Sequence, residues 1–161
     1  MTDTAPSRPS VSDPWIFLAT AGGAGYLPKA PGTWGSVVAV LLAWPIMQWT
    51  GMWGLAVAAA AVLLLGVKAT EVFCTKTGTH DPGAVVVDEV AGQWITLLAC
   101  PLDPLWFLTG FIAFRVFDIA KPPPARQIDR SMSTAWGVML DDVVAGVYGA
   151  LVIFIIAWML T

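Results

Sequence analysis

The chain has 161 residues, of which 57% are hydrophobic and only 12% are charged, whereas a soluble domain carries about 25% charged residues. This composition favours a single membrane-embedded domain over the alternative, a soluble and unusually apolar helical bundle. The net charge of −3 argues against nucleic-acid binding, which needs a basic surface. The two cysteines, Cys74 and Cys100, lack the spacing of a metal site and are interpreted as inert thiols.

Residues 1–13 are polar and are expected to form a disordered tail, which leaves residues 14–161 as one helical domain. The apolar segment 15–24 is too short and too rich in glycine to span a bilayer. It also lacks the order of regions found in a signal peptide. We therefore expect this segment to lie at the membrane interface or to be buried.

No charged residue occurs between Lys29 and Lys68. The break at Gln48–Gly51 divides this run and predicts a helical hairpin, with helices over residues 34–49 and 52–67. Each helix would be roughly 24 Å long, shorter than the bilayer core of about 30 Å.

Two further apolar segments, residues 90–100 and 105–117, flank a turn and predict a second hairpin. A polar, proline-rich stretch follows over residues 118–142. The apolar run 143–160 is the best single transmembrane candidate. The expected fold is therefore all-α: a polytopic helical membrane bundle with about five short apolar helices and a polar cytoplasmic face.

This pair of hairpins would bring nearly all ionisable residues to one face, the exception being Asp103 in the turn of the second hairpin. The opposite turns hold no basic residue. Short loops rich in lysine and arginine stay in the cytoplasm, so this face should be cytoplasmic and the C-terminus outside. The basic residues on this face are Arg8, Lys29, Lys68, Lys76, Arg115, Lys121, Arg126 and Arg130.

Acidic residues gather at the predicted helix ends on this face. Asp88 and Glu89 open the third helix, Asp118 ends the fourth, and Asp141 and Asp142 open the fifth. Each group alone could merely complement a helix dipole. Five carboxylates brought together would repel and raise one another's pKa unless a cation neutralised them. Mg²⁺ accepts carboxylate oxygens and substrate phosphate, so the sequence predicts a magnesium site formed by these acids.

Basic residues near this cluster could hold a phosphate group by charge-assisted hydrogen bonds, namely Lys121, Arg126 and Arg130. For Arg126 and Arg130 the alternative is general attraction to anionic lipid head groups. Arg115 could extend its head group to the interface or pair with Asp118.

Two further candidates are less specific. The Gly/Pro-rich segment 29–36 opens the first long helix, where free backbone N–H groups, with Thr33 and Ser36, could bind an anion. The alternative is an ordinary N-cap by Thr33. His80, the single histidine, could be a general acid for a leaving alcohol or a solvated loop residue.

The sequence lacks the motifs of three known classes of phosphate-transfer enzyme. Phosphatases that form a phosphohistidine intermediate need a second histidine, and this chain has a single one. Aspartyl-phosphate enzymes carry Asp-x-Asp near a strand, and that motif is absent here. A CDP-alcohol phosphotransferase motif would need Asp-Gly ahead of Ala125-Arg126 and glycine at position 135, which is Ala135.

Five motifs occur in an order that resembles the bacterial phosphatidylglycerophosphatase A family, over most of the chain from residue 14. They are PGTWGS at 31–36, HD…VVDEVAGQWI at 80–95, FRVFDIAKPPP at 114–124, Asp129-Arg130, and GVMLDDVVAG at 137–146. One departure is visible: Thr134-Ala135 stand where family members commonly have Gly-Gly.

The resemblance implies Mg²⁺-dependent hydrolysis of phosphatidylglycerophosphate to phosphatidylglycerol and phosphate at the bacterial inner membrane, with no protein partner. It places the functional acids at Asp88, Glu89, Asp118, Asp129, Asp141 and Asp142, with Lys121 as their basic partner. Because no serine, cysteine or histidine stands in an obvious nucleophile arrangement, we favour direct attack by water, with an aspartyl-phosphate intermediate as the alternative. The alternative function is a non-enzymatic cation-binding membrane protein or transporter subunit, whose acids would line a route at mid-membrane depth.

Overall fold

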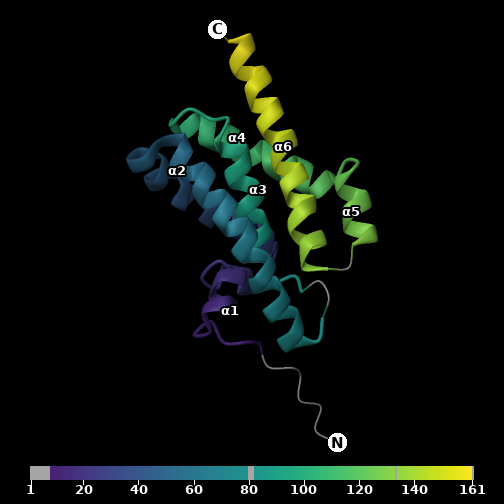
Figure 1. The fold of residues 1–161 in the computed structure, drawn as a ribbon. Helices are drawn as coiled ribbons and strands as arrows, with labels where there is room; N and C mark the ends of the chain where they lie inside the picture. The colour runs from purple at the N-terminus through teal and green to yellow at the C-terminus, as the bar shows by residue number, and fades with distance from the viewer. Residues whose placement is uncertain (1–7, 80–81, 133, 161) are drawn as a thin grey trace, which may run out of the picture.

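The computed structural model describes residues 8–79, 82–132 and 134–160, and within these ranges all regular secondary structure is helical, without a strand. This confirms the all-α class. Figure 1 shows the order of the elements, which are α1 (Pro14–Ala19), the short 3₁₀ turn η1 (Ala24–Tyr26), α2 (Pro31–Thr77), α3 (Val87–Leu97), α4 (Pro104–Ala120), α5 (Ala125–Ser131) and α6 (Ala135–Met159).

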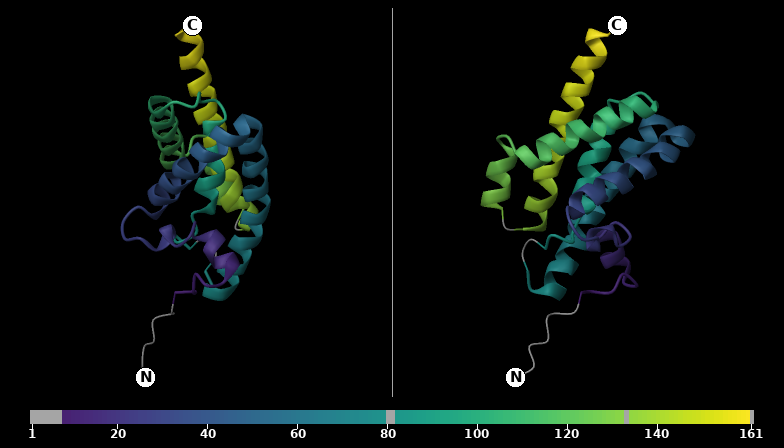
Figure 2. Two further views of the ribbon diagram at one scale, coloured as in Figure 1. Left: turned by 90° about the vertical axis from the view of Figure 1, so that its left-hand side faces the viewer. Right: turned by 180° about the vertical axis from the view of Figure 1, so that it is seen from behind.

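The long element α2 is a hairpin of two helical arms. Its continuity is broken at Gly51, which has φ 68° and ψ −171°, a conformation that glycine adopts without the steric cost of a Cβ. Figures 1 and 2 show the two arms folding back from this turn. The hairpin predicted from the break at Gln48–Gly51 is therefore confirmed.

Both ends of α2 extend beyond the predicted helices. The first arm begins at Pro31 behind Ala30, so the prediction that Thr33 forms the N-cap is wrong. The second arm continues past residue 67 to Thr77. The polar segment 68–77 is helical because Thr70 and Phe73, spaced three apart, are both buried and supply an inward face.

The last helix also begins earlier than its apolar run suggests. It starts at Ala135, and the N-cap Thr134 accepts a hydrogen bond from the backbone of Gly137. Asp141 and Asp142 therefore lie inside the helix beyond its first turn, and the prediction that they open the helix is wrong. Since they are only 5% and 4% exposed, they point into the bundle, and the helix-dipole explanation does not apply to them.

The centre of the bundle is α3, which packs against α2 on one side and α6 on the other. The contact with α6 is very close, because a Cβ on Gly92 would lie 2.5 Å from the backbone oxygen of Asp142. On the α2 side the Trp94 indole donates a 2.8 Å hydrogen bond to the carbonyl of Ala39. These contacts fix the first turn of α3 relative to both neighbours.

The N-terminal segment packs beside the second arm of α2. Ile16 of α1 is fully buried, in keeping with the buried alternative expected for segment 15–24. Within the predicted tail, Asp13 pairs with Lys76 and Arg8 donates to the carbonyl of Tyr26. Residues 1–7 lie outside the described part of the chain.

Two helices are long and apolar enough to cross a membrane, α2 and α6. Only 22% of the most apolar window of α2 and 28% of that of α6 is buried within the structure. Large apolar side chains such as Trp53, Val57 and Phe154 are therefore exposed. Figure 1 shows the last turns of α6 extending beyond the rest of the bundle.

Candidate active site

The five acids predicted to act together share one cavity. This cavity has a volume of about 340 Å³ and lies where α3, the first turn of α2, the end of α4 and the start of α6 meet. It is lined by Asp88, Glu89, Asp118, Asp141 and Asp142, together with Lys121. Residues as far apart in sequence as Pro31 and Asp142 thus converge because α3 is enclosed by the other helices.

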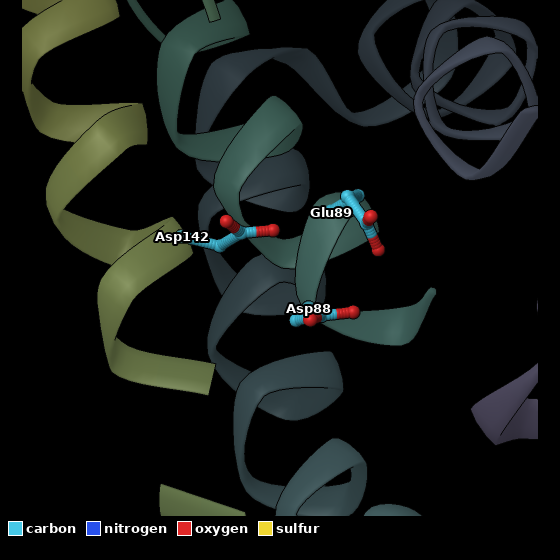
Figure 3. Close-up of side chains that lie close together, drawn as sticks. All are labelled: Asp88, Glu89 and Asp142. Atoms are coloured by element: carbon cyan, nitrogen blue, oxygen red, sulfur yellow. The ribbon is translucent and has the colours of Figure 1, made fainter. Parts of the chain in front are cut away.

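Three of these acids form the tightest group. A carboxylate oxygen from each of Asp88, Glu89 and Asp142 lies within 4.8 Å of the other two. In Figure 3, Asp142 reaches from α6 toward the turn of α3 that carries the other two residues. The distance is set by the glycine contact between α3 and α6, since Gly92 and Gly146 leave no side chain between the backbones.

The pair on α3, which lies outside the two candidate spans, is hard to ionise. Burial, and next the charge of Glu89, raise the pKa of Asp88 well above its usual value. Burial raises the pKa of Glu89 to about 8. In the described part of the chain, Asp88 Oδ1 and Glu89 Oε2 are buried without a hydrogen-bond partner. A bound cation would satisfy both oxygens and compensate the desolvated charge.

The other two acids each have a basic partner. Arg115 forms an ion pair with Asp118 one turn along α4, and Lys121 Nζ lies 2.6 Å from Asp141 Oδ2. The ion pairs of Asp118 and Asp141 set these two acids apart from the three acids of the tight group. The cavity thus separates the trio of Asp88, Glu89 and Asp142 from two acid–base pairs.

Lys121 is positioned by the end of α4. It is the C-cap residue, with φ 43° and ψ 62°, and this left-handed conformation is uncommon for a residue with a side chain. The turn directs its ammonium group into the cavity, where it meets Asp141. The predicted role of Lys121 as basic partner of the acids is consistent with this placement.

Arg115 belongs to the site, and of its two predicted alternatives the pairing with Asp118 is confirmed. Its side chain is 15% exposed, it pairs with Asp118, and its NH1 group lies 3.4 Å from Ser36 Oγ. A Cβ on Gly32 would lie 3.2 Å from Arg115 NH1 and 2.0 Å from Glu89 Oε1. Its three-residue spacing to Asp118, on an otherwise apolar helix, was the available signal for an inward-facing pair.

The segment at the start of α2 contributes differently from the prediction. Pro31 and Gly32 line the cavity, whereas Thr33 and Ser36 are not among its described lining residues. Ser36 is buried and donates its hydroxyl to the carbonyl of Gly32. This part of the site therefore presents backbone, and Ser36 acts on it through Arg115.

The remaining candidates do not join the cavity in the described structure. Arg126 is exposed on α5 and does not line the cavity, so general attraction to lipid head groups is the better explanation for it. The side chains of Asp129 and Arg130, and the whole of His80, lie outside the described residues.

Fold and site together define an all-helical protein with a buried carboxylate cavity of the kind that holds a divalent cation beside a phosphate group. The model of one family, described as Phosphatidylglycerophosphatase A, matches residues 17–157. The chain belongs to this family and is a phosphatase. No solved structure matches it.

Similar proteins cover nearly the whole chain. Phosphatidylglycerophosphatase A of Escherichia coli is 40% identical over 159 residues, which are 96% of this chain and 90% of that protein. The protein of the same name from Haemophilus influenzae is 37% identical over 99% of this chain and its own full length. A Bacteroides thetaiotaomicron protein, provisionally named a phosphatidylinositol-3-phosphatase, is 34% identical over 90% of this chain and 94% of its own.

Proposed function

We propose that this protein hydrolyses phosphatidylglycerophosphate to phosphatidylglycerol and inorganic phosphate, with Mg²⁺ as cofactor, at the cytoplasmic face of a bacterial inner membrane. The observation that carries the proposal is the trio Asp88, Glu89 and Asp142, whose carboxylates lie within 4.8 Å of one another. The names of the Escherichia coli and Haemophilus influenzae relatives supply the substrate.

The residues present fit a magnesium ion. Mg²⁺ prefers oxygen ligands and is commonly held by a few carboxylates together with substrate phosphate. Asp88, Glu89 and Asp142 would hold it, since two of their oxygens are buried without a partner. When bound, the ion supplies Lewis-acid chemistry, which neutralises charge on the phosphoryl oxygens and lowers the pKa of water.

The other groups of the cavity orient the substrate and stabilise its charge. Lys121 is positioned to neutralise negative charge that develops on the phosphoryl oxygens. The first turn of α2 at Pro31 and Gly32 presents the positive end of a helix to the same space. Both features favour a dianionic phosphate monoester as the occupant.

Direct attack by water suits the lining of the cavity. None of its described lining residues is serine, cysteine or histidine, so a covalent intermediate on those residues has no candidate there. A cavity carboxylate accepts the proton that the attacking water loses. His80 stays the candidate for donating a proton to the leaving alcohol.

The membrane topology is part of the proposal. α2 and α6 are apolar and mostly unburied in the structure, which suits contact with lipid better than a soluble core. The cavity is formed near the chain segments that hold the basic residues, and short basic loops stay in the cytoplasm. These features support our proposal of a multi-pass bundle of about five apolar helices whose cavity faces the cytoplasm.

Phosphate release by the purified protein tests the proposal. Phosphatidylglycerophosphate, phosphatidic acid, phosphatidylinositol 3-phosphate and glycerol phosphate should be compared, each with Mg²⁺ and with EDTA. We expect the first lipid to give the highest kcat/KM and EDTA to abolish release. Cation binding without release from any phosphomonoester would instead indicate the non-enzymatic alternative.

A further inference from the structure

A second, apolar groove runs between the first arm of α2 and α4. It has a volume of about 620 Å³. Its lining includes Val40, Leu41, Trp44, Phe107, Leu108 and Phe111. The aromatic rings that line the groove are well packed. Trp44 and Phe107 contact each other edge to face with ring centroids 5.1 Å apart, and Phe107 is only 2% exposed.

The groove and the carboxylate cavity are lined by different residues of the same two helices, α2 and α4. On α2, the groove residue Val37 directly follows Ser36, which contacts Arg115. On α4, the groove residue Phe111 lies one turn before Arg115. From Val37 to Pro45 the groove follows α2 for about 12 Å, at 1.5 Å per residue. Its direction is from the cavity toward the α2 turn at Gly51.

The chemistry of the lining changes abruptly along this path. The cavity end is charged, with Asp118 and Arg115 forming an ion pair, whereas all the groove residues from Val37 to Pro45 and from Pro104 to Phe111 that line it are apolar. A ligand that fills both spaces must have a phosphate-bearing head and an apolar chain. A phospholipid has this division, and its chain would point into the membrane.

We propose that the groove binds one acyl chain of the substrate lipid while the phosphate monoester of the same molecule occupies the carboxylate cavity. This inference rests on the proposed function and adds a chain-binding site to it. The groove fits a chain better than a helix of another protein, because it lies between two helices that already contact each other through Trp44 and Phe107. The chain contributes to kcat/KM by holding the head group in register with the acids.

Filling the groove tests the proposal. Leu41→Trp and Leu108→Trp place a bulky ring on groove residues that are 67% and 54% exposed, and Leu42→Trp is the matched control, since Leu42 is 48% exposed on the same arm but does not line the groove. For a dioleoyl substrate in detergent micelles we expect kcat/KM to fall at least tenfold in both groove variants. The control should stay within twofold of wild type. Groove variants that match the control would overturn the proposal.

Hydrolysis of the deacylated head group, which has no acyl chain, distinguishes a loss of chain binding from damage to the cavity. The groove variants should hydrolyse this head group at the wild-type rate, and an equal loss on both substrates would contradict a chain-binding role. A non-hydrolysable phosphonate lipid with a diazirine in mid-chain gives a readout that does not need turnover. Crosslinks should concentrate at residues 37–45 and 104–111. Equal labelling of the outer face of α6 would show general lipid contact or a second copy's docking surface instead.

The two proposals fail in different ways. If wild-type protein releases no phosphate from any lipid, the proposed function is wrong, whatever the crosslinks show. If wild-type protein is active while the groove variants are unaffected and the crosslinks are scattered, only the chain-binding site is wrong.

Discussion

Replacing Asp142 by asparagine tests the trio most sharply, because the structure predicts opposite effects on stability and activity. Asp142 is 4% exposed and lies in the second turn of α6, so it has no capping role to lose. Asparagine keeps nearly the same volume and removes one charge. The fold should therefore be retained.

The size of the expected change in stability follows from the spacing of the carboxylates. When both are ionised, two carboxylates within 4.8 Å of each other repel by at least about 3.5 kcal/mol at an effective dielectric constant of about 20. In EDTA this repulsion destabilises the folded protein, so Asp142→Asn should raise Tm by several degrees. With Mg²⁺ the wild-type protein should have the higher Tm, because the variant has lost a ligand and gains less stabilisation from binding the ion.

Activity should fall far more than stability changes. Loss of about 4 kcal/mol of transition-state stabilisation corresponds to roughly a thousandfold decrease in rate. Phosphate release and thermal unfolding, each measured in EDTA and in Mg²⁺, give the four values needed. The control is Asp103→Asn, which changes the acid that caps α4. Asp103 does not line the cavity, so this substitution should leave all four measured values unchanged. Wild-type activity together with a wild-type Mg²⁺ shift in Tm for Asp142→Asn would refute the reasoning.

Three further predictions follow from other features. Gly92→Ala should destabilise the protein by about 1–3 kcal/mol and lower activity, because its Cβ would lie 2.5 Å from the Asp142 carbonyl oxygen; chemical denaturation measures this, and an unchanged midpoint would contradict the close packing. In EDTA, Tm should fall as pH rises from about 4.5 to 8, because the Glu89 pKa is raised from 4.5 to about 8 in the folded state and the folded protein therefore binds the proton more tightly than the unfolded chain; Glu89→Gln should flatten this slope, and an equally steep profile would argue against burial of the carboxyl. A cysteine at Asp103 should react with an impermeant reagent from outside the cell and one at Gln127 only after permeabilisation; labelling of both from one side would contradict the topology.

Local sequence patterns were enough to predict the helical hairpin and the membership of the cavity. The charge-free run with its break at Gln48–Gly51 placed the α2 turn correctly. Acids at the ends of apolar segments were expected to meet on one face, and all five line the same cavity. Such patterns suffice because a long apolar run leaves few ways to satisfy the backbone.

Helix boundaries and charge pairing depended on tertiary packing, which the sequence does not display. Charged residues predict helix ends at Asp141 and Asp142, yet both lie inside α6 because α3 offers them a buried site. The division of the acids into two acid–base pairs and a trio required the distances between α3, α4 and α6. The contribution of Gly32 likewise depends on its approach to Glu89, far away in sequence.

The most direct test of the account is phosphate release from phosphatidylglycerophosphate by the purified protein, measured before and after removal of divalent cations. We predict release in Mg²⁺, none in EDTA, and recovery when Mg²⁺ is restored, with Asp142→Asn inactive throughout. Release that continues unchanged in EDTA, or that persists in the Asp142→Asn variant, would contradict a metal site formed by Asp88, Glu89 and Asp142.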